Sequence, residues 1–482
     1  MDIRPVLYVG GILLVSLAAA MLLPALVDAA SGHSDWRVFS GSSAVTLFAG
    51  MSLILTNRAG ERQRLRLREA FLLTAASWLL VAAFGALPFA FSGLDLSYTD
   101  AFFEAMSGVT TTGSTVIVGL DAAPPGILLW RALLQWLGGI GIIVTAIAVL
   151  PLLQVGGMQL FRTESTDRSE KALPRLTQLT AGIGGIYLGL TAIWSVALWL
   201  AGMTPFEAVA HAMSTLATGG YSTADASIGH FGNAAIDLIV LLGMLVGGVP
   251  FVLYLQALHG RGRLLLADAQ VRGFLGILAV ATLVMAAGQI AVNDARPLTA
   301  LRHAAFNTVS VMTGTGFAST DYGAWGPFAN VGFFVLMFIG GCAGSTACGI
   351  KIFRVQILTA ACWAQLQRLI RPRSVAVTYY AGQPVPLPVL ESVASFLLLY
   401  LLCFAVMATI LCLFDLDFLT AISGAATAIS NVGPGLGAVI GPAGSFATLP
   451  DGAKWVLAAG MLLGRLELFT ILVLFMPSFW RS

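Results

Sequence analysis

The sequence predicts an all-α polytopic membrane protein. Four similar units of helix, re-entrant pore helix with filter, and helix surround a central pore, and two extra transmembrane helices precede them. Of 482 residues, 58% are hydrophobic and 10% are charged, and the mean hydropathy is +0.89, as is typical of membrane proteins. A short glycine-containing stretch recurs four times between pairs of apolar segments. Most lysines and arginines fall in alternate connecting segments, as the positive-inside rule requires.

The fourfold repeat is found by aligning the chain on Gly113, Gly220, Gly316 and Gly433. An alanine stands twelve residues before each glycine, at Ala101, Ala208, Ala304 and Ala421. A small hydroxyl residue stands six before, at Ser107, Ser214, Ser310 and Thr427. Two matches at the same offsets in four places indicate an internal repeat. Ordinary tight turns between helices are the alternative.

Residues 1–69 are predicted to hold the two N-terminal spans and a basic loop. Val6–Val27 is longer than the core of a signal peptide, so we expect a retained helix. Val38–Thr56 returns the chain to the first side. Five arginines between Arg58 and Arg68 then predict a cytoplasmic loop. This loop is interpreted as a solvated topology marker, and no binding to nucleic acid is expected.

The four units are predicted at residues 70–177, 178–271, 272–386 and 387–482. Each contains two spans that flank one re-entrant segment, so every unit begins and ends in the cytoplasm, and both termini lie there. The predicted spans are Phe71–Phe91, Leu128–Leu150, Leu179–Ala201, Ile236–Leu258, Phe274–Val292, Phe328–Ile339, Val389–Phe414 and Ala453–Met476. The predicted re-entrant segments are Ala101–Gly113, Ala208–Gly220, Ala304–Gly316 and Ala421–Gly433.

The re-entrant segments are predicted to form one ion filter. Glycine allows backbone conformations in which carbonyl oxygens replace the hydration shell of an ion. The pore helices would aim the negative ends of their dipoles at a cation. Threonine hydroxyls are candidates for a further, inner site. The expected potassium-binding residues are Thr110, Thr111, Thr112, Gly113, Ala217, Thr218, Gly219, Gly220, Thr313, Gly314, Thr315, Gly316, Ser430, Asn431, Val432 and Gly433.

A gate is predicted at residues 340–350, which are too rich in glycine and small residues for a good helix. Its candidate residues are Gly340, Gly341, Gly344, Ser345, Thr346 and Gly349, with Lys351 at the cytoplasmic end. A close-packed glycine kink is the alternative. Arg465 lies in the predicted last span, where ionisable groups usually face a pathway or a bundle interior. We expect it to form an electrostatic barrier below the filter, with a structural salt bridge as the alternative.

Three polar residues of the re-entrant segments have no assigned role in the filter. Glu104 and His211 each stand nine residues before a filter glycine, and His303 stands near the start of the third segment. Hydrogen bonds that brace the pore helices are expected in preference to a proton relay. The five cysteines lack the spacing of a metal site, and carboxylates, histidines and nucleophiles do not gather in one stretch. The sequence therefore predicts no enzyme activity.

Four stretches resemble the TrkH/TrkG potassium-uptake subunits of bacteria, within the Trk/Ktr/HKT superfamily of cation transporters. They are Met106–Gly113, Gln135–Val144, Gly156–Arg162 and Gly340–Thr346. The resemblance extends over essentially the whole chain. It implies a potassium-selective pore in the bacterial inner membrane, with potassium as the transported ion and no covalent cofactor. Glycine at all four filter positions goes with potassium preference in this superfamily.

The resemblance also implies partners. A homodimer in the lipid bilayer is expected, together with a cytosolic TrkA-type regulatory subunit that binds nucleotides. Cys342 and Cys348 depart from the small residues expected in the gate loop. The alternative function is secondary transport coupled to protons or sodium, which typically uses two inverted repeats rather than four units around one axis.

Overall fold

The computed structural model describes residues 2–57, 67–148, 172–373 and 376–481. Regular structure in this part of the chain is helical except for one hairpin, in which β1 (Tyr379–Tyr380) pairs antiparallel with β2 (Gln383–Pro384). The all-α prediction is confirmed. Most of the arginine-rich loop (58–66) and the Gly156–Arg162 stretch lie outside the described residues.

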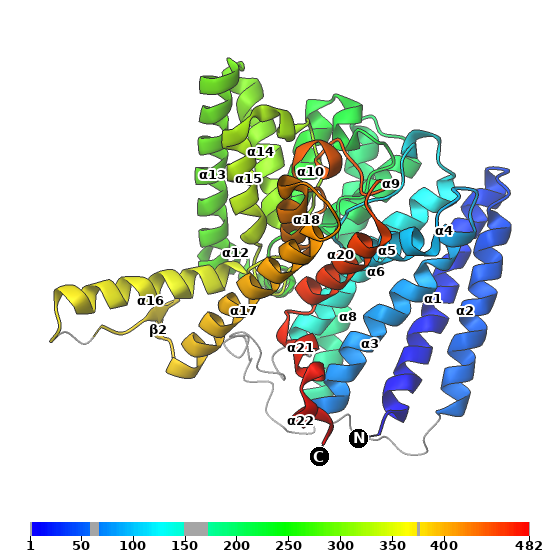
Figure 1. Cartoon of the computed structure of the whole chain (residues 1–482), viewed down its shortest axis with the longest axis horizontal. Helices are drawn as coiled ribbons and strands as arrows, with labels where there is room; N and C mark the ends of the chain where they lie inside the picture. The colour runs from blue at the N-terminus through cyan, green and yellow to red at the C-terminus, as the bar shows by residue number, and fades with distance from the viewer. Residues whose placement is uncertain (1, 58–66, 149–171, 374–375, 482) are drawn as a thin grey trace.

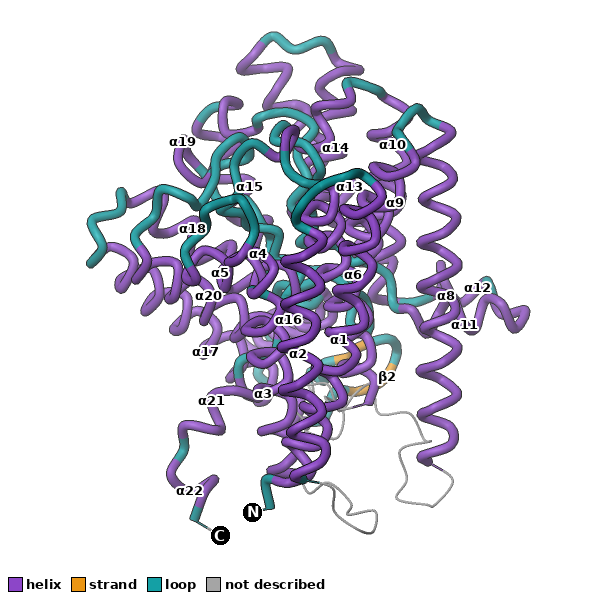
Figure 2. The backbone as a smooth tube through the Cα atoms, turned by 90° about the vertical axis from the view of Figure 1, so that its right-hand side faces the viewer, coloured by secondary structure: helices purple, strands orange, loops and turns teal. Residues whose placement is uncertain are grey.

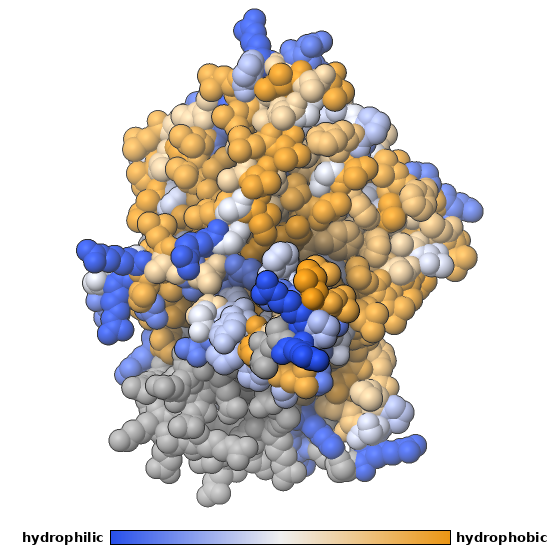
Figure 3. Space-filling model, turned by 90° about the vertical axis from the view of Figure 1, so that its left-hand side faces the viewer, coloured by the Kyte–Doolittle hydropathy of each residue, from blue (hydrophilic) through white to orange (hydrophobic). Residues whose placement is uncertain are grey.

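The described residues contain seven helices that are long and apolar enough to cross a membrane. They are α1 (Arg4–Ala30), α2 (Trp36–Thr56), α3 (Leu67–Gly85) continued by α4 (Leu87–Phe91), α6 (Pro125–Ala148), α8 (Ala172–Leu200), α13 (Ala269–Asn293) and α17 (Leu387–Cys412). Two bent pairs also qualify, α10 (Ala234–Gly247) with α11 (Phe251–Gln256) and α20 (Asp451–Arg465) with α21 (Phe469–Leu472). With the short apolar helix α15 (Pro327–Phe338), these segments match the predicted spans. Figure 3 shows the broad apolar surface that they present on one face.

Two spans predicted as continuous are broken, and those predictions were wrong. The segment Ile236–Leu258 bends by 93° between α10 and α11, where Pro250 lacks the N–H that a helix needs. The segment Ala453–Met476 bends by 107° after Arg465, where Glu467 and Leu468 adopt positive φ angles of 58° and 46°. Helix α20 therefore ends at Arg465, and Glu467 lies within the break. Each run is apolar enough to qualify as one span, so hydropathy could not reveal either break.

The four re-entrant helices are present in the predicted register, and their C-terminal halves are buried in the protein. They are α5 (Tyr98–Val109), α9 (Pro205–Leu216), α14 (Pro297–Thr313) and α18 (Phe418–Ser430). Each begins before its aligned alanine, and α14 is the longest at 17 residues. Three have side-chain N-caps, in Ser97, Thr204 and Asp417. Hydrogen bonds from Thr420 hold the pKa of the Asp417 carboxyl below its ordinary value.

The N-terminal hairpin packs on the first unit. Gly11 of α1 and Gly50 of α2 allow the two helices to approach closely, since a β-carbon on Gly11 would lie 2.8 Å from the Gly50 oxygen. The buried Asp28, at the end of α1, accepts a hydrogen bond of 2.6 Å from the Gly126 N–H and so caps the start of α6. Figure 2 shows α1, α2 and α3 running alongside one another. Both termini lie at the same end of the molecule (Figure 1).

The hydrophobic core joins neighbouring units around the pore helices. One buried cluster combines Phe103 of the first unit with Leu457 of the fourth. A second combines Met244 of the second unit with Phe306 of the third, and includes Val432 of the fourth. The pore helices are thus held from both sides.

Shorter elements connect the spans and the pore helices. The remaining α-helices are α12 (Arg263–Ala267), α16 (Ile352–Ile370), α19 (Gly437–Ile440) and α22 (Pro477–Trp480). The 3-10 turns are η1 (Leu120–Ala122), η4 (Ser227–Phe231), η6 (Tyr322–Trp325) and η7 (Val473–Phe475), and η5 (Ala257–Arg261) is a π-type turn. In Figure 1, α16 projects from the body of the protein.

Candidate functional site

The four pore helices end in the same way. In each unit, the N–H of the residue before the filter glycine donates to the carbonyl of the aligned Ser or Thr, six residues before that glycine. The four bonds are Thr112 to Ser107 (2.8 Å), Gly219 to Ser214 (2.9 Å), Thr315 to Ser310 (2.9 Å) and Val432 to Thr427 (3.1 Å). Together with a second bond from the preceding residue, this is the Schellman arrangement, in which one residue is left-handed.

The left-handed residue stands two before each filter glycine. Its φ angle is 50° at Thr111, 48° at Thr218, 73° at Gly314 and 53° at Asn431. The filter glycines are also left-handed, with φ of 90°, 78°, 83° and 102° in chain order. The residue between them is not, so the sign of φ alternates along each segment. Left-handed backbone is unfavourable for threonine by roughly 1–2 kcal/mol, and strain of this kind gathers at functional sites.

The four glycines form a closed ring. A β-carbon added to Gly113 would lie less than 3.0 Å from the carbonyl oxygen of Gly219 in the next unit. The same holds for Gly220 and Thr315 O, and for Gly316 and Val432 O. Gly433 closes the circuit, because its added β-carbon would lie 2.9 Å from the Thr112 oxygen. Each glycine therefore faces the carbonyl that precedes the glycine of the next unit, and a side chain fits at none of the four.

The ring is braced by side chains, and the sequence analysis assigned no such role to Gln135, Ser114 or Tyr400. Gln135 of α6 donates to the Gly219 oxygen (2.6 Å) and accepts from the Tyr221 N–H (3.1 Å). Ser114 donates to the Gly433 oxygen (2.7 Å), and Asn431 donates to the Thr112 hydroxyl (2.9 Å). The Tyr400 and Ser430 hydroxyls lie 2.7 Å apart. Polar residues within an apolar span were the available signal for Gln135 and Tyr400.

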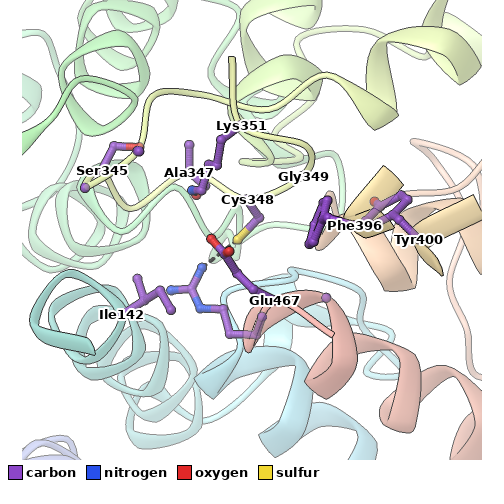
Figure 4. A pocket seen from close by; sticks show the side chains of 13 residues that line it. Ile142, Ser345, Ala347, Cys348, Gly349, Lys351, Phe396, Tyr400 and Glu467 are labelled. Carbon is purple, nitrogen blue, oxygen red and sulfur yellow. Dashed lines mark hydrogen bonds between the residues drawn. The ribbon is translucent and has the colours of Figure 1, made fainter. Parts of the chain in front are cut away.

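The ring separates two cavities. One is a vestibule of about 70 Å³, on the side of the ring where the residues that follow the glycines lie. Its lining includes Gly113, Gly220 and Gly316. On the other side, a cavity of about 20 Å³ is lined by residues of the 340–350 loop and of α17 and α20. Figure 4 shows this second cavity, with Lys351, Cys348 and Glu467 around it and Phe396 and Tyr400 along one wall. It has room for about one water molecule.

The loop predicted as a gate is irregular, as expected, and joins α15 to α16. Its ends are pinned together, because the Gly340 N–H donates to the Ile350 oxygen (2.9 Å) and the Ile350 N–H to the Phe338 oxygen (3.0 Å). Its Thr346 hydroxyl lies 3.0 Å from the Leu216 and Gly247 oxygens and 3.2 Å from the Thr218 hydroxyl. The break between α10 and α11 leaves the carbonyls of Gly247 and Gly248 free for the loop. Gly247 accepts from the Thr346 N–H, and Gly248 accepts from the Cys342 N–H.

The same loop touches the left-handed residues of three units. Thr218 contacts Thr346, and the Thr111 hydroxyl lies 3.9 Å from the Cys348 sulfur. A β-carbon on Gly314 would lie 3.5 Å from the Cys348 nitrogen. The 340–350 loop therefore lies directly against one side of the ring. Of its two cysteines, Cys342 is fully buried in the core and Cys348 lines the small cavity.

Arg465 joins this loop to the rest of the protein. Its side chain is 2% exposed, and Nη1 donates to the Thr346 oxygen (3.2 Å) while Nη2 donates to the Gly138 oxygen (3.1 Å). Within the described residues it forms no ion pair with an acidic side chain. Glu467 pairs instead with Arg354 of α16, and Lys351 donates to the Ala347 oxygen.

Glu104, His211 and His303 each form a hydrogen bond with a residue two or three positions after the filter glycine of their own unit. Glu104 accepts from Thr115 and from the Val116 N–H, His211 bonds Ser222, and His303 bonds Ser319. The expected bracing is present. It joins each of these three pore helices to the extended segment that follows its own filter glycine, rather than joining one pore helix to another. Among the described residues, His, Cys, Asp and Glu form no group that could hold a metal ion.

Comparison with known proteins places this geometry in a family. Residues 36–482 match the family TrkH, described as a cation transport protein. The chain belongs to the TrkH family. Among its relatives, the Trk system potassium uptake protein TrkI of Halomonas elongata is 46% identical over 480 residues, which are 99% of this chain and 97% of TrkI.

Two further relatives match along their whole length. The crystal structure of the potassium transporter TrkH from Vibrio parahaemolyticus superposes with a TM-score of 0.92 at 39% identity, and the match covers 100% of both chains. The Trk system potassium uptake protein TrkG of Escherichia coli K12 is 34% identical, over 100% of this chain and 99% of TrkG. Membership of the TrkH family, with its apolar helices, identifies the chain as a multi-pass membrane protein.

Proposed function

We propose that this chain mediates potassium uptake through a gated pore whose filter is the ring of Gly113, Gly220, Gly316 and Gly433. The relatives named potassium uptake proteins, which match along the whole chain, support this substrate. The main structural support for this mechanism is the closed ring, in which every filter glycine lies against a carbonyl of the next unit. One chain supplies all four quarters of that ring.

Potassium would bind to backbone oxygens of the four filter segments, 110–113, 217–220, 313–316 and 430–433. The alternating handedness of the backbone turns neighbouring carbonyls toward the axis, where they replace water around the ion. The C-terminal ends of α5, α9, α14 and α18 point at the ring and place the negative ends of four helix dipoles there. Discrimination then depends on how firmly the surrounding hydrogen bonds hold the ring.

The gate would be the 340–350 loop, with Gly340, Gly341, Gly344, Ser345, Thr346 and Gly349 as its flexible or small residues. In its present position the loop contacts three units beneath the ring, so a cation leaving the filter meets it directly. Arg465 would add positive charge at the same level and oppose the passage of cations. Lys351 would fix the inner end of the loop through Ala347.

The bacterial inner membrane is the proposed location, with both termini in the cytoplasm. The common end of the two termini and the basic bias of the adjoining segments support this orientation. A homodimer and a TrkA-type nucleotide-binding regulatory subunit in the cytosol are proposed from the resemblance, and the relatives' description as parts of a Trk system supports a partner. Coupling to protons or sodium remains the alternative, but the fourfold ring favours conduction along one axis.

Flux into liposomes tests the proposal. Purified protein is reconstituted alone, and rubidium and sodium uptake are measured with and without a candidate cytosolic partner. We expect rubidium uptake well above that of protein-free liposomes and above sodium uptake. Equal entry of both ions would contradict a selective filter. A rubidium flux that requires a proton gradient would instead favour coupled transport.

A further inference from the structure

One position in the repeat has a shared structural role but different chemistry in each unit. Nine residues before the filter glycines stand Glu104, His211, Asn307 and Gly424. In the first three units this side chain extends from the pore helix to the segment that follows the filter glycine of the same unit. In these three units the position therefore ties the pore helix to the segment after the glycine, behind the ring.

In the first unit the tie is ionic. The Glu104 carboxylate accepts from the Thr115 hydroxyl at 3.0 Å and from the Val116 N–H at 2.9 Å, two and three residues after Gly113. It also accepts from Nε of Arg131 at 2.8 Å. The glutamate is fully buried and the arginine is 1% exposed.

Arg131 extends this tie to the second unit. Its Nη1 donates to the Ser222 oxygen (2.8 Å), two residues after Gly220, and its Nη2 donates to the Thr115 hydroxyl (3.2 Å). The guanidinium also lies over the Tyr221 ring, 3.9 Å from its centre. Tyr221 belongs to the second unit, and its hydroxyl donates to two carbonyls of the first unit, those of Glu104 (2.9 Å) and Ser114 (3.2 Å).

The other units use weaker contacts at the same place. His211 bonds the Ser222 hydroxyl at 2.9 Å, and Asn307 accepts from the Ser319 N–H at 3.2 Å. Gly424 has no side chain, and in the fourth unit the neighbouring Ser423 hydroxyl accepts from the Leu436 N–H at 3.0 Å. The four quarters of one ring are thus held with graded strength, from a charged network to a single hydroxyl.

We propose that Glu104 and Arg131 are positioning residues for ion selectivity, which fix the first and second quarters of the ring through Thr115 and Ser222. This inference rests on the proposed filter function. In a low-dielectric interior, charged hydrogen bonds are strong and directional. The segments that follow Gly113 and Gly220 are held by such bonds, so the ring resists widening around an ion of a different size. Neither Glu104 nor Arg131 touches the ion; each acts through the strand behind the carbonyls.

Glu104→Gln tests the proposal. The amide keeps the size of the side chain but removes the charge that pairs with Arg131, and it cannot accept at every present contact. We expect the rubidium-to-sodium flux ratio to fall by about tenfold in liposomes, as for the loss of one charge-assisted hydrogen bond. A merely structural pair would change protein yield or melting temperature and leave this ratio unchanged.

Asp237→Asn is the matched control. Asp237 of α10 is also buried and pairs at 2.8 Å with an arginine, Arg302 of α14, but at the outer part of the second and third units. The same acid-to-amide change there should lower the melting temperature and keep the flux ratio. An unchanged ratio in folded Glu104→Gln protein, or equal changes in both variants, would overturn the proposal.

Thr115→Val keeps the inference testable if Glu104→Gln fails to fold. It removes the hydroxyl that both Glu104 and Arg131 bond, while the ion pair itself remains. We expect the flux ratio to fall in the same direction, and a folded variant with the ratio of the unaltered chain would refute the positioning role. Selective rubidium flux through the unaltered chain would still support the filter, so the two proposals fail separately.

Discussion

The guanidinium of Arg465 lies against the sulfur of Cys348, with 2.5 Å between Nη1 and Sγ. Through this contact and its bond to the Thr346 oxygen, the break in the last span is joined directly to the loop beneath the filter. The other end of the guanidinium reaches Gly138 of α6 in the first unit. One buried cation therefore connects the first, third and fourth units at the level of the gate.

Replacing this cation should open the path. In Arg465→Ala the positive charge is lost, and the loop loses its contacts through Cys348 and the Thr346 oxygen, so we expect higher rubidium flux into liposomes. Buried charges of this kind oppose cations in a low-dielectric environment. Flux equal to that of the unaltered protein would argue against the barrier role. Arg302→Ala, which removes an arginine remote from the loop, is the control for general loss of structure.

Selectivity should depend on the absence of a side chain at Gly113. A β-carbon there meets the Gly219 carbonyl oxygen, so Gly113→Ser must displace a carbonyl of the ring. We expect the rubidium-to-sodium flux ratio to fall by about tenfold, equivalent to about 1.4 kcal/mol of discrimination. Gly119→Ser, at a left-handed glycine with open space around it, is the control for backbone strain alone. A selective Gly113→Ser protein would contradict the filter assignment.

The repeat, the filter and the irregular loop were all predictable because each depends on local sequence. The glycines and the small hydroxyls recur at fixed offsets, and the structure places them at equivalent points of four Schellman-ended helices. Asparagine is enriched in left-handed backbone but threonine is not, so left-handed backbone at Thr111 and Thr218 was not foreseen. It follows from closing the ring, which is a tertiary constraint.

The breaks and the braces depend on contacts between distant parts of the chain, and sequence reasoning missed them. α10 ends where its freed carbonyls bond the gate loop, and hydropathy alone describes that stretch as one span. The sequence analysis gave Arg131 no role. A buried arginine in an apolar span, with a glutamate in the preceding pore helix, was the available signal for the pair with Glu104.

Thr346 should control how firmly the loop stays closed. Its hydroxyl bridges the carbonyls of Leu216 and Gly247 and receives a bond from Thr218. Thr346→Val removes these side-chain links between the loop and the second unit and leaves the backbone hydrogen bonds in place. We expect a higher rubidium flux, because the closed position loses stability relative to an open one. Measured in the same liposomes, Ser345→Ala should leave the flux unchanged, since that hydroxyl bonds only Cys342 within the loop. Equal flux in both variants would place the gate elsewhere.

The last prediction concerns the ion pair between Glu467 and Arg354. Glu467 lies in the strained break after Arg465, and Arg354 lies just beyond the loop, with its guanidinium 3.9 Å from the centre of the Phe396 ring. Both are buried, so Glu467→Gln breaks a buried ion pair, a change that typically destabilises a protein by about 3 kcal/mol or more. We expect a lower melting temperature of the purified protein in detergent. Asp451→Asn removes an exposed acid at the start of α20 and should melt as the unaltered chain does, because surface ion pairs contribute little. If Glu467→Gln melts at the unaltered temperature, the pair does not hold the break in place, and the strain at Leu468 must be balanced by packing alone.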